Sequence, residues 1–271
     1  MKTIPLRLAF RLALIGMVFL FAFLILFYPA AVTLRFALDA QFRRTGESAL
    51  IVSWFESVAG RYESWADRFL QSRFAAGLEH DNVAATEWPM FGSVFFLVTA
   101  ADLQRQGGID ATRGGLRRAV DKAAEVVVSP DTASWVRQKW GPGYLERENL
   151  FYRMLLILGL SSYESLTGDT RHREIMSRQR AQLAAELSAA PRHLLDDYPG
   201  ECYPNDILWA VAAIQRAARL DATHHDPLAR SLMTTFDGPL RAPEGLPAFQ
   251  VDARTGRQLQ NARGCGNSGI L

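Results

Sequence analysis

The sequence predicts an all-α protein, an α/α toroid of the six-hairpin barrel type, incomplete or truncated, behind one N-terminal transmembrane helix. Three observations lead to this fold class. An uncharged apolar run covers residues 12–34. Four apolar helix openings follow, spaced about 60 residues apart. More polar helical segments lie between them. Alternation of an apolar with an amphipathic helix is typical of stacked helical hairpins, whose inner helices open toward one pocket. Ordinary capped helices in a bundle are the alternative.

The apolar run over 12–34 is long enough to cross a membrane. Its roughly 23 residues rise about 34 Å as a helix, against a hydrocarbon core of about 30 Å. The segment 37–40, Ala-Leu-Asp-Ala, is a poor match to the small-x-small cleavage site of a secretory signal. We therefore expect an uncleaved anchor and linker over 1–45 and a globular domain over 46–271.

Basic residues flank the apolar run on both sides. Lys2, Arg7 and Arg11 precede it, and Arg35, Arg43 and Arg44 follow it. The second group weakens the positive-inside argument for orientation. The expected arrangement is a single-pass membrane protein with a short basic tail inside and a periplasmic or other extracytoplasmic domain.

The domain is expected to alternate inner and outer helices. A long amphipathic helix is predicted first. After it, each inner helix is expected to be followed by an outer one. Pro89 and Pro204 suit the first turn of a helix, because the N–H that proline lacks would have no hydrogen-bond acceptor within the helix there. The predicted helices cover 47–78, 87–106, 110–128, 130–139, 148–166, 169–189, 204–220 and 226–236, with a small hairpin or extended loop over 246–251 and 257–260.

The candidate site lies at the openings of the inner helices. Cys202 and Asp206 flank Pro204 there, Glu201 lies beside Cys202 as a further possible acid/base group, and Glu148 opens the preceding inner helix. Two carboxyls and a thiol in unlike environments can act as acid and base, so Glu148, Cys202 and Asp206 are the candidate catalytic residues. The structural alternative is that the carboxylates only stabilise a helix dipole and that the thiol is a small buried residue.

The candidate substrate-binding residues surround the same openings. Aromatic side chains suit the face of a sugar or an allylic cation, and amides orient polar groups. Cys202 and Cys265 open consecutive inner helices, so they are either a disulfide pair or two free thiols. The substrate-binding candidates are Trp88, Asn149, Tyr152, Tyr203, Asn205 and Cys265.

Composition and motifs exclude several classes of function. Hydrophobic residues make up 49% of the 271 residues, charged residues 21%, and the net charge is +2. A charge so close to zero, without a Lys/Arg run, argues against a nucleic-acid partner. The sequence lacks zinc-binding spacings, a phosphate-binding loop and a nucleophile elbow. We therefore expect no metal and no cofactor, and a small molecule as the substrate.

Two segments and a short C-terminal motif resemble the linalool dehydratase/isomerase-like domain family. They are ENLFYRMLLILGLSSYESLTGD over 148–169, GECYPNDILWAVAAI over 200–214 and GCGNS over 264–268. The resemblance covers roughly residues 85–271. It implies an (α/α) six-hairpin barrel and a cofactor-free enzyme that hydrates, dehydrates and isomerises a monoterpene alcohol. It also implies that Cys202, before Pro204-Asn205, matches a catalytic cysteine, and that Glu148, Asn149 and Tyr152 match an E-N-x-x-Y opening.

The chain departs from that family at two catalytic positions. The family's histidine falls where this chain has Met154, Leu155 and Leu156, and its second cysteine falls at Val211. A fold can be shared without the reaction. The expected function is therefore a membrane-anchored lyase or isomerase acting on a small hydroxylated, terpenoid-like substrate. The alternatives are a sugar-acting hydrolase or epimerase of the toroid type, and a non-catalytic envelope binding or scaffold module.

Overall fold

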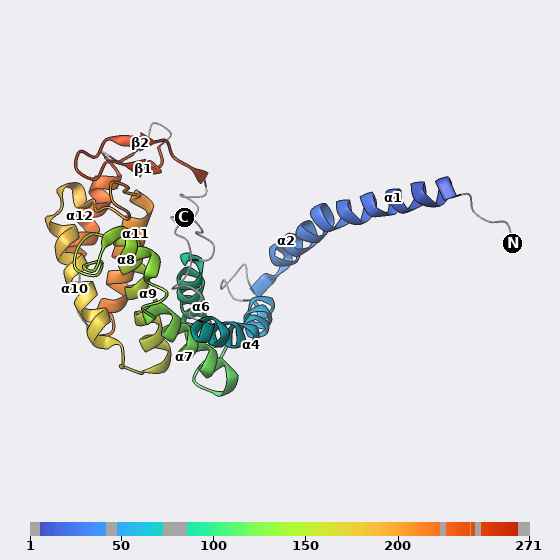
Figure 1. Ribbon diagram of the computed structural model, residues 1–271, viewed down its shortest axis with the longest axis horizontal. Coiled ribbons are helices and arrows are strands. Elements are labelled where there is room, and N and C mark those ends of the chain that lie inside the picture. The colour runs from blue at the N-terminus through green and yellow to red at the C-terminus, as the bar shows by residue number, and fades with distance from the viewer. Residues whose placement is uncertain are drawn as a thin grey trace. The chain divides into compact units, whose positions relative to one another are not determined.

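A computed structural model describes residues 6–41, 48–72, 86–222, 226–238, 240, 241 and 245–264. The chain divides into two units, Met1–Ser53 and Trp54–Leu271, whose elements are labelled in Figure 1. The predicted helix opening at Cys265, and any pairing of that cysteine with Cys202, lie outside the described residues.

The first unit contains the predicted apolar helix. Helix α1 (Leu6–Ala22), the π-helical turn η1 (Phe23–Phe27) and α2 (Tyr28–Leu38) follow one another without a break. The π turn ends two residues before Pro29, which has no N–H to donate to a carbonyl of the preceding turn. The stretch Arg7–Leu38 is long and apolar enough to span a membrane, and its most apolar window is not buried in protein.

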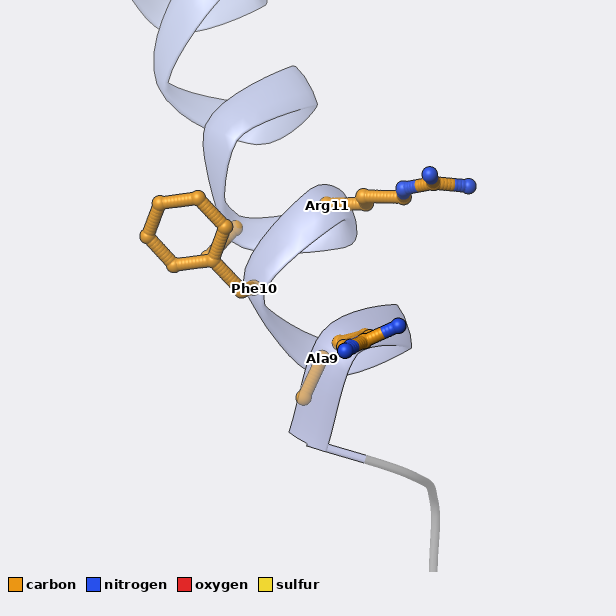
Figure 2. Close-up of a pocket in the computed structure, with 5 residues that line it drawn as sticks. Ala9, Phe10 and Arg11 are labelled. Carbon is orange, nitrogen blue, oxygen red and sulfur yellow. The ribbon is translucent and has the colours of Figure 1, made fainter.

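The N-terminal end of α1 carries the basic residues that flank the span. Figure 2 shows Phe10 and Arg11 projecting from different sides of the helix. The shallow surface there is lined by Arg7, Ala9, Phe10, Arg11 and Ala13, all from α1 itself. It is therefore the surface of a single helix, and it does not form a binding cavity.

Charges placed in the middle of this helix should abolish membrane insertion. An arginine at the centre of a spanning helix costs roughly 3 kcal/mol on the insertion scale, so Leu20→Arg with Leu24→Arg should add about 6 kcal/mol. We expect the natural chain to stay in the membrane pellet after an alkaline carbonate wash and the double variant to leave it. Leu20→Ile with Leu24→Ile is the matched control. Release of the unprocessed natural chain without detergent would contradict the anchor.

The second unit is a helical body followed by a small hairpin. The hairpin pairs Gln250 with Gln260 in an antiparallel ribbon, as predicted. The helix predicted over 47–78 is described only as far as residue 72. The elements are α4 (Ala49–Ser72, which begins just before the unit boundary), α6 (Trp88–Arg105), α7 (Gly114–Val128), α8 (Ser134–Trp140), α9 (Leu150–Thr167), α10 (Arg173–Ala189), the 3₁₀ turn η3 (Pro191–His193), α11 (Pro204–Ala218), α12 (Asp226–Phe236), β1 (Gln250–Val251) and β2 (Gln258–Gln260).

Helix α9 is the centre of this unit. Every residue over 152–164 is buried, and the helix packs against α6, α7, α10 and α11. A helix that is apolar on all sides is stable only when neighbours surround it. Gly159 permits the closest approach, since a Cβ there would lie 3.0 Å from a methyl of Val94 and 3.3 Å from one of Val127.

The helices pack in the order expected of stacked hairpins. Helices α6 and α11 both pack on α9, while α7 contacts α6 and α9, and α10 contacts α9 and α11. The pairs α6/α7, α9/α10 and α11/α12 thus place one helix in an inner row and the next in an outer row. The predicted all-α fold is therefore confirmed, with inner and outer helices alternating along the described part of the domain.

The three inner helices run parallel. Near their N-terminal ends, the rings of Phe91 in α6 and Phe151 in α9 lie 6.4 Å apart. Near their C-terminal ends, the side-chain amide of Gln104 donates to the carbonyl of Leu166 at 3.0 Å. Arg216 of α11 also reaches Asp102 of α6 there, at 3.4 Å. The prediction that these helices open at one end of the domain is therefore confirmed.

Candidate functional site

The N-terminal ends of α6 and α11 bring together a group of ionisable residues, here called the acid cluster: Glu87, Asp197, Tyr198, Glu201 and Asp206. Glu87 directly precedes α6, and Asp206 lies in the first turn of α11. The other three belong to the loop before α11, which turns back on itself through a bridge between Tyr198 and Glu201. Gly200 supports this turn with a φ of +82°, a conformation that glycine adopts without strain.

Glu87 is held in place by Tyr198. The phenol of Tyr198 donates a hydrogen bond to Oε1 of Glu87 at 2.7 Å. Its ring lies near Trp135 and Phe151, with centroids 6.0 and 6.4 Å away. The ammonium of Lys139 is 4.3 Å from the centre of the same ring. Burial raises the pKa of Glu87, while the bond from Tyr198 and the charge of Lys139 work in the opposite direction.

Asp206 is the carboxyl most suited to act as an acid near neutral pH. Burial raises its pKa to about 7, and the negative charge of Glu87 adds to the effect. The sequence analysis named Asp206 as a candidate catalytic carboxyl, and the structure gives it this raised pKa in the first turn of α11.

Asp197 is the most deeply buried member of the acid cluster. Its side chain has no exposed surface. Oδ2 accepts the backbone N–H of Tyr203 at 2.9 Å, and Oδ1 has no hydrogen-bond partner among the residues that the structure describes. Burial, followed by the charge of Asp206, raises the pKa of Asp197 well above its ordinary value. Two neighbouring carboxyls that cannot both ionise cheaply are typical of acid/base sites, and they also occur in structural networks.

Partly exposed aromatic side chains, here called the aromatic strip, continue from the acid cluster along the inner helices: Phe91, Phe95, Phe151 and Trp209. The rings of Phe91 and Phe95 lie 4.5 Å apart, and those of Phe95 and Trp209 lie 5.7 Å apart. Phe91 is about one turn beyond Glu87 in α6, and Trp209 is about one turn beyond Asp206 in α11, so each lies on the same side as its carboxyl.

Cys202 lies beside the acid cluster but is enclosed. It is fully buried, and its carbonyl accepts the N–H of Val251 at 3.0 Å from the hairpin. Burial, with the nearby carboxyls Asp197, Asp196 and Asp206, raises the pKa of its thiol. The helix dipole that favours a thiolate is therefore outweighed, and the sulfur is held as a thiol.

Glu148 does not open α9, contrary to the sequence prediction. The helix begins at Leu150, and Glu148 and Asn149 have left-handed backbone conformations with φ of +34° and +48°. The side chain lines a separate cavity together with Glu186 and Arg254. Burial raises the pKa of Glu148, followed by the charges of Asp196 and Glu186.

Asn149 and Tyr152, predicted to bind substrate, belong to the core. The amide nitrogen of Asn149 donates to the carbonyl of Tyr144 at 2.8 Å, and Asn149 is only 1% exposed. Tyr152 packs between Trp135 and Tyr144, with ring centroids 6.1 and 5.6 Å away. Both side chains pack the start of α9 against α8 and the loop that follows α8.

The remaining predicted residues lie at the opening of the inner helices. Trp88 is 65% exposed at the start of α6. The phenol of Tyr203 donates to Oε2 of Glu201 at 2.6 Å. Asn205 lies in the first turn of α11, and its buried Oδ1 lacks a hydrogen-bond partner in the described part of the chain. Tyr203 and Asn205 therefore adjoin the acid cluster.

Sequence reasoning missed three members of this site, namely Glu87, Asp197 and Tyr198. The available signal was the acidic and aromatic loop Asp-Asp-Tyr-Pro-Gly at 196–200 and the glutamate directly before Trp88. Among the described residues, there is no group of three His, Cys, Asp or Glu side chains placed to hold a metal ion. Comparison of the sequence with protein-family models and with curated proteins finds no match.

Proposed function

We propose that this chain is a membrane-anchored enzyme with its domain on the periplasmic side, a lyase or isomerase of the hydro-lyase type. Its substrate would be a small hydroxylated, terpenoid-like molecule. The observation that carries the proposal is Asp206, whose pKa of about 7 accompanies a second carboxyl, Glu87, at the start of an aromatic strip. The resemblance to the linalool dehydratase/isomerase-like family supports the same class of reaction. The acid and base would differ, because the family's histidine and second cysteine are replaced here.

Asp206 would act as the acid. Its carboxyl keeps a proton up to about pH 7 and would give it to the substrate hydroxyl. The C–O bond then breaks, its electron pair leaves with water, and a positive charge develops on carbon. The faces of the aromatic strip would stabilise that cation, an interaction worth roughly 0.5 to 2 kcal/mol per ring.

Glu87 would act as the base. The bond from Tyr198 fixes one carboxylate oxygen, which leaves the other to remove a proton from the carbon next to the cation. The electrons of that C–H bond form the double bond of the product. Return of the proton at another carbon would give an isomer, and the reverse sequence would hydrate the alkene.

Turnover of candidate substrates by the full chain in detergent tests this proposal. The panel comprises terpenoid alcohols and glycosides, with products separated by gas chromatography. We expect an alkene or isomer from an alcohol, and a loss of roughly 100-fold or more in rate for Asp206→Asn and for Glu87→Gln. The rate should fall as pH rises above about 7, because Asp206 then loses the proton it donates.

The exposed Glu56→Gln is the matched control and should turn over substrate at the natural rate. Retention of activity by both site variants at unchanged stability would refute the acid/base roles. Cleavage of glycosides alone would favour the sugar-acting hydrolase. Binding without turnover, abolished in both variants, would favour the binding module.

A further inference from the structure

A cavity lies between the start of α9 and the end of α10, and no residue of the acid cluster lines it. Its volume is about 520 Å³. Ala189, Ala190, Pro191, Leu194 and Leu195 form an apolar part, and charged residues complete it. The charged residues are Glu146, Arg147, Glu148, Glu186 and Arg254.

One carboxylate of this cavity is fully engaged. Oε2 of Glu186 accepts from Nη1 of Arg153 at 2.8 Å and from the backbone N–H of Glu148 at 2.9 Å. Oε1 accepts from Nη2 of Arg153 at 2.9 Å. Glu186 is therefore committed to the protein's own structure and is not free to bind a ligand.

The other charges in the cavity lack such partners. Within the described ranges, no hydrogen bond or ion pair engages the carboxylate of Glu148 or the guanidinium groups of Arg147 and Arg254. Both arginines are nevertheless near enough to affect the charge of Glu148. The carboxylates of Glu146 and Glu148 thus line the same cavity as two guanidinium groups, with no ion pair between them in the described part of the chain.

The backbone at Glu148 is held in an unfavourable conformation. Left-handed φ values at two successive non-glycine residues, Glu148 (+34°) and Asn149 (+48°), are energetically unfavourable. The surrounding structure enforces them: Glu186 holds the N–H of Glu148, and Nη1 of Arg153 donates to its carbonyl at 2.9 Å. Such enforced strain is found preferentially at ligand-binding positions. Here it turns Glu148 away from the helix start and into the cavity.

We propose that this cavity binds a small zwitterion, an α-amino acid with an apolar side chain. The ammonium group would pair with Glu148, the carboxylate with Arg254 and Arg147, and the side chain would lie against Pro191, Leu194 and Leu195. A planar guanidinium suits a carboxylate because it can donate two parallel hydrogen bonds. This inference is independent of the reaction proposed for the acid cluster.

Calorimetric titration of the full chain in detergent with L-leucine tests the proposal. We expect saturable binding in the millimolar range or tighter. Glu148→Gln and Arg254→Gln should each weaken it at least tenfold. Glu56→Gln and Arg178→Gln, both at exposed positions, are matched controls and should leave binding unchanged. Thermal unfolding of each variant separates loss of binding from loss of folding.

Two compounds that each carry only one of the charged groups of L-leucine test whether the cavity requires a zwitterion. Isovalerate carries only the carboxylate, and isopentylamine carries only the ammonium group. Each should bind at least tenfold more weakly than L-leucine. Equal binding of either compound would overturn the zwitterion, and an absence of saturable binding at millimolar L-leucine would overturn the site. Binding that survives both Glu148→Gln and Arg254→Gln in folded protein would overturn the assigned residues.

Discussion

Replacing Asp206 by Asn is expected to stabilise the protein at pH 8 by about 2 to 4 kcal/mol and to change its stability little at pH 3. The folded protein raises the pKa of Asp206 from 3.8 to about 7. Between these two values the folded state binds more protons than the unfolded chain, so stability falls as pH rises through that window. Asparagine cannot ionise and escapes this cost.

Urea denaturation of natural protein and variant at pH 3, 5, 7 and 8 would measure the effect. The gain should grow from about pH 4 to pH 7 and level off above it. Glu56→Gln, at an exposed position, should show no comparable trend. A variant no more stable than the natural chain at pH 8 would mean that Asp206 ionises there without cost, and its role as an acid would lose its basis.

The opposite expectations for stability and activity distinguish a functional carboxyl from a structural one. A structural carboxylate stabilises the fold, and its loss harms both properties. A carboxyl kept protonated by burial destabilises the fold at pH values above its pKa. Proteins tend to keep such a destabilising residue where the function requires it. Asp206→Asn should therefore give a more stable protein with less activity.

The arrangement of helices could be predicted because it rests on local patterns. The apolar openings recur about every 60 residues, and α9 is apolar on every side, which required neighbours all around it. The N-terminal apolar helix was equally plain, since a long uncharged apolar stretch suits few environments other than a membrane. Asp206 could be predicted for a similar reason, because Pro204 marks the start of α11 and places it in the first turn.

The rest of the site depends on long-range packing that no local pattern reports. The bond from Tyr198 to Glu87 joins residues 111 positions apart. Asp196 and Asp197 are neighbours of the same type, yet only Asp197 is fully buried, because the loop before α11 turns it inward. Glu148 was misplaced because Asn149 starts α9 from a left-handed conformation, which is rarely adopted by residues other than glycine.

Replacing the buried Arg153 by Met should destabilise the domain by about 3 to 5 kcal/mol. The Arg153 side chain has no exposed surface, and its guanidinium binds both oxygens of Glu186, Oε1 of Gln179 at 2.8 Å and the carbonyl of Glu148. Methionine fills much of the same space but leaves these acceptors without their donor. Arg178→Met, at an exposed position of the same outer helix α10 that carries Gln179 and Glu186, should cost less than about 0.5 kcal/mol.

The double variant Arg153→Met/Glu186→Met shows whether the loss of folding stability comes from leaving the carboxylate of Glu186 without its charged partner. Removal of both partners leaves neither the buried guanidinium nor the partly buried carboxylate unpaired. The two substitutions should therefore cost less together than the sum of their separate costs, by about 1 to 3 kcal/mol. Additive losses in urea denaturation would mean that Arg153 acts through its packing volume alone. A coupled loss would mean that the ion pair between Arg153 and Glu186 stabilises the start of α9. The same two side chains hold Glu148 in its left-handed conformation beside the cavity.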